Sequence, residues 1–152
     1  MEKVEVKTVL EELKSYFQRR LPSSAENVIL NVKSQDVTVT TSPTLLTWVL
    51  ENLIKNAIDS IDKESGEVTL SSEIINTEVS ITVNDNGRGI VRRDWKNVFR
   101  PGYTTKERGW GVGLSMVQRI VEDFLRGSIQ IKSSEIEKGT SIEVRLPHAS
   151  RL

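Results

Sequence analysis

Apolar side chains recur along this chain at two spacings, one typical of helices and the other typical of strands. Helical spacing predicts helices over residues 4–20, 44–61 and 113–124. Alternating or short continuous apolar runs predict strands over residues 28–32, 37–41, 68–75, 79–83, 128–132 and 140–146. The strands come in adjacent pairs. This order favours an α+β fold, a two-layer sandwich with a mixed, mainly antiparallel sheet on about three helices, over a doubly wound parallel sheet.

The helix predicted over residues 44–61 has two different faces. Ser42 is an N-cap candidate, and Pro43 fits the first helical position. One face is a continuous apolar stripe of Leu46, Val49, Leu50, Leu53, Ala57 and Ile61. The other face is polar and consists of Asn52, Lys55, Asn56 and Asp59. Asparagine is a mediocre helix former, so this face is either an ordinary solvated surface or a row of amide oxygens presented to a ligand or metal.

Two glycine clusters follow further along the chain. In the first, Asp85 stands directly ahead of Gly87 and Gly89, and in the second, residues 109–113 read G-W-G-V-G and open into a predicted helix. Glycine lets the backbone approach a ligand closely, and amides at a helix N-terminus suit phosphate. A buried carboxylate can accept a hydrogen bond from an exocyclic amine such as that of adenine. The two clusters therefore predict a nucleotide site.

The segment between the clusters has no clear periodicity. Residues 90–108 contain Pro101 and Gly102, which disfavour regular structure, so we expect a loop of nearly twenty residues there. Loops of that length inside a domain tend to be functional lids. We expect a mobile lid at about residues 90–110. The helix that follows is expected to bury Leu114, Val117, Ile120, Val121 and Phe124.

Composition narrows the class of protein. The chain has 152 residues, of which 37% are hydrophobic and 28% are charged, and it fits one domain over residues 1–152. Lysine plus arginine equals aspartate plus glutamate, at 21 each, so bulk charge indicates neither a nucleic-acid partner nor direct membrane contact. No apolar run is long enough to span a membrane, and the start does not resemble a signal peptide.

The cysteine and histidine counts exclude several kinds of site. There is no cysteine, which removes disulfides, thiol nucleophiles and cysteine zinc sites and is compatible with a cytoplasmic location. The only histidine, His148, is expected to be an exposed residue beyond the last strand. One histidine cannot form a histidine-rich metal site.

Four motifs occur in a defined order. Residues 52–57 read N-L-I-K-N-A and residues 85–90 read D-N-G-R-G-I, while residues 99–106 read F-R-P-G-Y-T-T-K and residues 109–114 read G-W-G-V-G-L. They resemble the asparagine box, first glycine box, phenylalanine box and second glycine box of the catalytic ATP-binding domain of sensor histidine kinases. That domain has the Bergerat fold and belongs to the superfamily of gyrase and the mismatch-repair ATPase MutL. The resemblance covers about residues 45–147.

The resemblance implies that the chain binds ATP, with ADP as the product, together with Mg²⁺. It implies that Asp85 bonds the adenine amino group and that Asn56 ligates Mg²⁺, a cation that favours oxygen ligands and keeps several waters. The resemblance also implies that Asn52, Lys106 and Arg108 take part in catalysis. Lys106 and Arg108 would neutralise charge on the transferring phosphoryl group. The implied nucleotide-binding set is Asn52, Asn56, Asp59, Asp85, Gly87, Gly89, Ile90, Tyr103, Thr104, Thr105, Lys106, Arg108, Gly109, Trp110, Gly111, Val112, Gly113, Leu114 and Thr140.

Several lid residues also have a purely structural interpretation. Lys106 and Arg108 are alternatively ordinary solvated charges. Phe99 and Tyr103 are expected mainly to anchor the lid to the core. Trp110, between two glycines, either stacks on a ligand or caps the lid, and the sequence does not decide between these roles.

The helix over residues 44–61 departs from the family pattern in two ways. Asp59 stands where many members have lysine, which removes one phosphate contact from this helix. Asn52 stands where gyrase and MutL ATPases typically have a glutamate general base, and an amide cannot take a proton at neutral pH. Glu51 is a further catalytic candidate, which would polarise an acceptor histidine. Alternatively, Glu51 forms an ion pair with Lys55 at i+4, and we favour this ion pair.

The resemblance thus implies phosphoryl transfer to a protein rather than efficient ATP hydrolysis. The acceptor would be a histidine on a separate dimerisation domain, from which the phosphoryl group passes to an aspartate of a response regulator. No helical pattern follows His148, so we expect the chain to be the catalytic fragment of a longer sensor kinase, monomeric and inactive without its acceptor domain. The alternatives are an anti-sigma-type serine kinase, which generally carries the missing glutamate, and a nucleotide-sensing module without catalysis.

Overall fold

The computed structural model describes residues 1–103 and 113–148. Its helices are α1 (Val6–Gln18), α2 (Pro43–Asp59) and α3 (Leu114–Arg119), and a π-helical turn (Ile120–Phe124) continues α3. Its strands are β1 (Glu2–Glu5), β2 (Val28–Ser34), β3 (Thr38–Thr41), β4 (Gly66–Ile75), β5 (Glu78–Asp85), β6 (Ser128–Glu135) and β7 (Gly139–Pro147). None of these helices is both long enough and apolar enough to cross a membrane.

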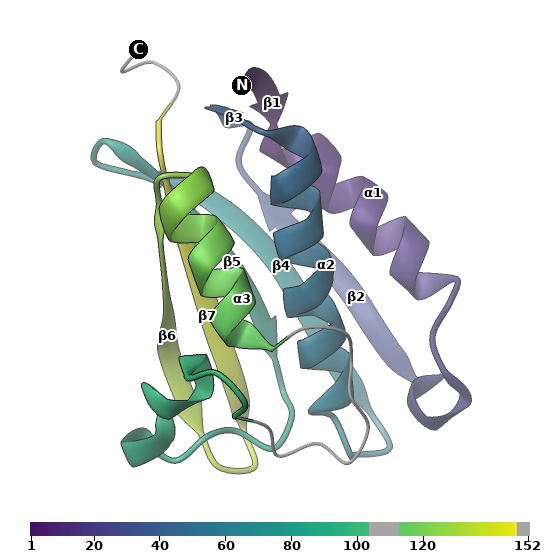
Figure 1. The fold of residues 1–152 in the computed structure, drawn as a ribbon. Coiled ribbons are helices and arrows are strands. Elements are labelled where there is room, and N and C mark those ends of the chain that lie inside the picture. Colours follow the sequence, from purple (N-terminus) through teal and green to yellow (C-terminus); the bar gives the residue numbers. More distant parts are fainter. Residues whose placement is uncertain (104–112, 149–152) are drawn as a thin grey trace.

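Five of the strands form one sheet in the order β2-β4-β5-β7-β6. β2 runs parallel to β4, and the other neighbouring pairs are antiparallel. The three helices lie on one face of this sheet (Figure 1). The core lies between the two layers and includes Leu50, Leu70 and Ile81, none of which is exposed. The expected two-layer sandwich with a mixed, mainly antiparallel sheet is confirmed.

α2 forms where the sequence predicts it. The Ser42 side chain accepts a hydrogen bond from Leu45 N at 3.2 Å, and Pro43 is the first helical residue. The apolar face is buried through Leu46, Val49, Leu50, Leu53, Ile54, Ala57 and Ile58. Packing of such a face supplies most of the stability of a helix in a folded protein. It also fixes the rotation of α2 about its axis, and therefore the direction in which the polar face points.

The sequence pattern does not predict β1, which forms a separate two-stranded sheet with β3. Val4 is 7% exposed and lies opposite Val39 in this sheet. α1 consequently begins at Val6 rather than at residue 4, and the Val6 N–H donates to Val37 O at 3.0 Å. A four-residue strand with one buried side chain has no measurable period, so only its pairing with β3 identifies it.

The end of the α3 segment differs from the expectation. Leu125 N donates to Ile120 O at 3.0 Å, which is an i→i+5 bond. Leu125 is 3% exposed, whereas Phe124, which was expected to be buried, is 55% exposed. The π turn inserts one residue into the helical repeat, so the buried position moves from residue 124 to residue 125. Val117 and Val121 are buried as expected, while Leu114 and Ile120 are only partly buried.

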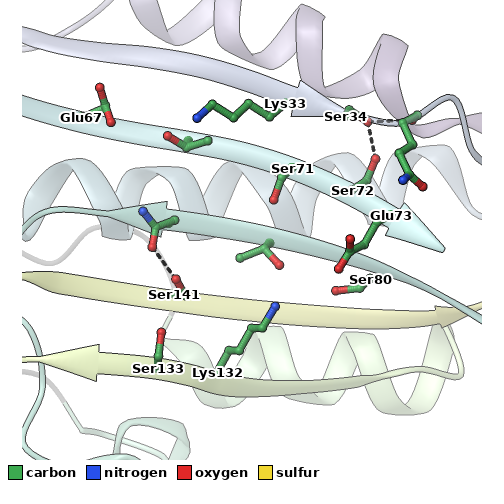
Figure 2. Close-up of a pocket in the computed structure, with 14 residues that line it drawn as sticks. Lys33, Ser34, Glu67, Ser71, Ser72, Glu73, Ser80, Lys132, Ser133 and Ser141 are labelled. Atoms are coloured by element: carbon green, nitrogen blue, oxygen red, sulfur yellow. Dashed lines mark hydrogen bonds between the residues drawn. The ribbon is translucent and has the colours of Figure 1, made fainter. Parts of the chain in front are cut away.

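The sheet face away from the helices carries polar side chains (Figure 2). The positive charges of Lys33 and Lys132 are balanced there by the negative charges of Glu67 and Glu73. These four residues line a hollow of about 720 Å³. The rest of the lining consists largely of hydroxyl side chains from Ser34, Thr69, Ser71, Ser72, Ser80, Thr82, Ser133 and Ser141. Hydroxyl contacts such as that between Ser34 and Ser72 join neighbouring strands. The balanced charge and the internal bonding indicate an ordinary solvated sheet face.

Glu143 is the exception on this face, because its side chain is wholly buried. Ser80 Oγ donates to Glu143 Oε2 at 2.5 Å, and Gln130 Nε2 donates to Oε1 at 2.9 Å. Arg145 Nε forms an ion pair with Oε1 at 3.1 Å. Burial raises the pKa of Glu143, but these contacts lower it by more, so the pKa lies below its usual value. The carboxylate thereby links the three strands β5, β6 and β7.

The π turn can be tested with a matched pair of variants. Leu125→Ala should lower the free energy of unfolding by about 2–5 kcal/mol, because it removes a buried side chain. Phe124→Ala should lower it by less than about 1 kcal/mol, because that side chain faces solvent. Urea denaturation measures both. A larger loss for Phe124→Ala than for Leu125→Ala would show that the helix remains regular through residue 124.

Candidate functional site

α2 brings three of the predicted polar residues to the edge of the core. Asn52, Asn56 and Asp59 are half-buried. Asn52 Nδ2 donates to Trp48 O at 2.8 Å, so the Asn52 carbonyl oxygen and the second N–H are the groups that can meet a ligand. Half-buried amides on a single face support the binding interpretation over that of a fully solvated surface.

Asp85 is the last residue of β5 and is 6% exposed. Its Oδ1 accepts a hydrogen bond from Gly87 N at 2.8 Å. Burial raises the pKa of Asp85, and hydrogen bonds from Gly87 N, the Ser60 side chain and Thr140 N, with the Arg88 charge, offset this rise only in part. A carboxylate with this environment is an acceptor suited to a ligand that brings a further N–H.

The turn after β5 packs directly on the C-terminal cap of α2. A Cβ atom at Gly87 would overlap the hydroxyl and the carbonyl oxygen of Ser60. Arg88 N donates to the same Ser60 carbonyl at 3.0 Å. These contacts hold Asp85 in a fixed position relative to Asn56, one helical turn before the cap.

The β6–β7 hairpin packs against the other side of this turn. Gly89 has φ +77°, and a Cβ atom there would overlap the backbone carbonyl of Glu135. Gly139 has φ +120°, and a Cβ atom there would overlap the carbonyl of Asp85. Both positions therefore require glycine, because the backbone has a positive φ and because a neighbouring backbone lies where a side chain would begin. The predicted role of Gly87 and Gly89 in shaping a base pocket stays a prediction.

Thr140 lies beside Asp85. The two residues are opposite one another in the antiparallel register of β5 and β7, and Thr140 is 6% exposed. Side chains directly opposite in this way share one face of the sheet, with Cβ atoms about 4.5–5.5 Å apart. Thr140 Oγ1 lies 2.7 Å from Ser134 Oγ, and Ile90 N donates to the same Ser134 oxygen at 2.7 Å. Thr140, Ile90 and Asp85, all predicted from the sequence, are thus brought together.

Ser60 and Ser134 are site residues that the sequence analysis does not identify. Ser60 is the C-cap of α2 and lies against the turn that carries Asp85. Ser134 lies in β6 and contacts both Ile90 and Thr140. Neither serine belongs to one of the four motifs. The position of Ser60 directly after the asparagine-bearing helix is the only local signal available for either residue.

Residues 90–103 are the described part of the predicted lid. They are not without regular structure as expected, because they contain two 3₁₀ turns, Arg92–Asp94 and Asn97–Phe99. Such turns need only local i→i+3 bonds and produce no apolar periodicity. Trp95 Nε1 donates to Ile90 O at 3.0 Å. Phe99 and Tyr103 pack partly buried against the core, which confirms that they anchor this segment.

Eight predicted site residues lie outside the described residues: Thr104, Thr105, Lys106, Arg108, Gly109, Trp110, Gly111 and Val112. The two that follow them are described. Gly113 is the exposed N-cap of α3, with open space where a Cβ would lie. Leu114 is the first helical residue and packs partly on the core.

Two further expectations concern charged or titratable residues. Glu51 is half-buried on α2, and none of the salt bridges between described residues joins it to Lys55. The ion pair that we favoured is therefore not formed in the structure. His148 follows β7, and its backbone N–H donates to Thr77 O at 3.1 Å. It is half-buried rather than exposed.

The donor set suits a cation held mainly by a ligand. Among the described residues, no group of three or more His, Cys, Asp or Glu side chains could hold a metal ion. Asn56 supplies an amide oxygen on the half-buried face of α2. Mg²⁺ is commonly bound by one or two protein groups together with substrate phosphates and water. The residues present therefore fit Mg²⁺ bound together with a nucleotide rather than in an all-protein cage.

Comparison with known proteins gives consistent results. The sequence profile of the histidine kinase-, DNA gyrase B-, and HSP90-like ATPases matches residues 41–150. The sensor histidine kinase ZraS of Salmonella typhi is 41% identical over 110 residues, which are 72% of this chain and 23% of ZraS. This chain thus spans less than a quarter of that relative.

Solved structures share the whole fold. The catalytic domain of histidine kinase ThkA has a TM-score of 0.85 and 27% identity, with 99% of both chains covered. ThkA in complex with the response regulator protein TrrA gives a TM-score of 0.80 at 24% identity, covering 98% of this chain and 42% of that one. The expected Bergerat fold is therefore confirmed.

Gly89→Ala and Gly102→Ala test the packing of the hairpin on the turn. Both glycines have positive φ, +77° and +80°, but only Gly89 has neighbours where a Cβ would lie. Gly102→Ala should lower the free energy of unfolding by about 1 kcal/mol, the cost of a left-handed backbone. Gly89→Ala should lower it by about 3 kcal/mol or more, because the hairpin must also move. Equal losses in urea denaturation would contradict the close approach.

Proposed function

Since this chain belongs to the histidine kinase-, DNA gyrase B-, and HSP90-like ATPase family, we propose that it is the ATP-binding catalytic domain of a two-component sensor histidine kinase. The observation that carries the proposal is the buried Asp85 carboxylate, which is held by Gly87 N at the end of β5. In this proposal Asp85 accepts a hydrogen bond from the adenine amino group. Gly87 and Gly89 shape the base pocket, and Thr140 borders it.

The phosphates in this proposal lie along the polar face of α2. Asn56 holds Mg²⁺, Asn52 presents its carbonyl oxygen one helical turn earlier, and Asp59 lies one turn later. Mg²⁺, when bound, supplies charge neutralisation at the phosphate oxygens. The chain also offers phosphate contacts from the second glycine box up to Gly113 and Leu114, and cationic side chains at Lys106 and Arg108. Of these, residues 109–112, Lys106 and Arg108 lie outside the described residues.

The proposed reaction moves the γ-phosphoryl group of ATP to a histidine ring nitrogen. The bond between the γ-phosphorus and the bridging oxygen breaks, a phosphorus–nitrogen bond forms, and ADP leaves with the electron pair of the broken bond. The other ring nitrogen then gives up its proton. Asn52 cannot accept a proton, and its amide group is bonded to Trp48 O. Glu51, half-buried and without a salt bridge to Lys55 among the described residues, is the group on α2 that can polarise the imidazole or take that proton.

The phosphoryl acceptor belongs to another domain in this proposal. His148, the one histidine of the chain, follows β7 and does not lie on a helix. We assign the acceptor to the dimerisation domain of the longer kinase, with a response regulator as the next partner, and the complex of ThkA with TrrA supports the second assignment. The chain by itself is proposed to be a monomeric, cytoplasmic domain without nucleic-acid or direct membrane contact.

Asp85→Asn should weaken nucleotide binding by about 100-fold, because a carboxylate that accepts from the adenine amine is replaced by an amide. Calorimetric titration of ADP and of a non-hydrolysable ATP analogue, with and without Mg²⁺, measures the effect. Asp36→Asn is the matched control, since the Asp36 side chain is 87% exposed and lies in the β2–β3 connection. Absence of binding by the wild type would refute the nucleotide site. Equal binding by Asp85→Asn would refute the role given to Asp85.

Phosphorylation of a separately supplied acceptor domain tests the chemistry. With ATP labelled at the γ position, the wild type should give an acid-labile, base-stable label, because a phosphorus–nitrogen bond is cleaved by acid. Glu51→Gln should slow the transfer by about 100-fold with unchanged ADP affinity, whereas Lys55→Ala should leave the rate unchanged. An acid-stable label would indicate a serine kinase instead. Nucleotide binding without any label would indicate a nucleotide-sensing module.

A further inference from the structure

Ser134 lies where the β6–β7 hairpin meets the turn after β5, and its hydroxyl contacts three groups. Ile90 N donates to Ser134 Oγ at 2.7 Å. The carbonyl oxygen of Gly139 lies at 3.1 Å, and Thr140 Oγ1 lies at 2.7 Å. The backbone amide can only donate and the carbonyl can only accept, whereas the threonine hydroxyl can do either. The direction of the Ser134–Thr140 bond is therefore decided by the other two contacts.

A hydroxyl has one proton and two lone pairs. If Ser134 donates its proton to Gly139 O, its two lone pairs accept from Ile90 N and from the Thr140 hydroxyl, and all four groups are satisfied. If Ser134 instead donates to Thr140, the contact with Gly139 O has no proton and one lone pair of Ser134 is unused. This network is partly buried, and a fully satisfied network is favoured over a partly satisfied one. The complete arrangement directs the Thr140 proton toward Ser134.

This direction determines what Thr140 offers to a ligand. With its proton given to Ser134, the Thr140 oxygen presents only lone pairs. Thr140 lies directly opposite Asp85 across β5 and β7, and both side chains are almost fully buried. The carboxylate is also an acceptor. Two acceptors side by side match an amino group at position 6 of a purine, which carries two N–H bonds, and oppose a carbonyl oxygen at that position.

We propose that Ser134 is a specificity-determining residue, which fixes the Thr140 hydroxyl as an acceptor and so makes the site favour a 6-aminopurine over a 6-oxopurine. This inference rests on the proposed nucleotide site and adds a residue that touches no ligand itself. Ser134 acts through Thr140, and its contacts with Ile90 and Gly139 keep the hydroxyl in place. A residue that only fastened the hairpin to the turn would affect both kinds of purine equally.

The test compares ADP with inosine diphosphate, which carries a carbonyl in place of the amino group at position 6 and a proton on the neighbouring N1. Calorimetry on the full 152-residue chain should show that the wild type favours ADP. In Ser134→Ala, the Thr140 proton becomes free to point into the site and can be donated to a carbonyl. The ratio of the two dissociation constants should then fall by about tenfold, equivalent to one hydrogen bond. An unchanged ratio would overturn the inference.

A double-mutant cycle separates this role from a structural one. In a Thr140→Val background the further change Ser134→Ala should leave the ratio unchanged, because the hydroxyl that it orients is gone. A shift of the same size in that background would overturn the inference. Ser133→Ala is the matched control, since its side chain lines the opposite, solvated face of the sheet, and should keep the wild-type ratio. If Ser134→Ala does not fold, Ser134→Cys is the alternative variant, because it nearly keeps the side-chain size but has a much weaker hydrogen-bonding group. It should also lower the ratio of the two dissociation constants.

The outcomes distinguish this inference from the proposed function. If the wild type binds neither nucleotide, the nucleotide site itself is refuted and the inference falls with it. If the wild type binds both nucleotides equally well, the nucleotide site stands and the role of Ser134 is refuted. A tenfold fall in Ser134→Ala that disappears in the Thr140→Val background supports both.

Discussion

The burial of the Asp85 carboxylate is the constraint on which the rest of the site depends. An ionised group removed from water costs several kcal/mol unless donors replace its hydration. Gly87 N in the turn donates to this carboxylate at 2.8 Å, and the Ser60 side chain at the end of α2 and the backbone of Thr140 in β7 lie close enough to lower its pKa. Burial still raises the pKa of Asp85, which shows that the protein alone does not fully compensate the charge. A ligand that brings a further donor is therefore favoured at this position.

Bringing these three segments to one carboxylate requires backbones to approach more closely than side chains allow. Gly87 makes this possible against Ser60, and Gly89 and Gly139 make it possible between the turn and the β6–β7 hairpin. The same packing fixes the orientation of α2. Its apolar face contributes to the core, while its opposite face carries the half-buried Asn52 and Asn56. Stability and the geometry of the site are consequently properties of the same contacts, so substitutions at these glycines act on both.

Elements with a long, regular pattern could be predicted from the sequence, and short or irregular ones could not. α2, with its N-cap at Ser42, and the paired strands of the main sheet form within a few residues of the expected bounds. β1, the 3₁₀ turns of residues 92–99 and the π turn after α3 have too few residues for a period to be visible. Leu125 replaces Phe124 as the buried residue because of the π turn, which the i→i+5 bond from Leu125 N to Ile120 O marks and no apolar spacing reveals.

The sequence by itself determined the residue types of the site and their local setting: a carboxylate before two glycines, and two asparagines one helical turn apart on an amphipathic helix. These follow from short-range spacing, because helix and strand periods place neighbouring residues on known faces. Only the tertiary structure decided which distant groups complete the site. Ser134 contacts Ile90 across 44 positions of the chain, and Ser60 meets Gly87 across the packing of α2 on the turn. Such contacts depend on how whole elements pack, and a serine outside any motif carries no local sign of them.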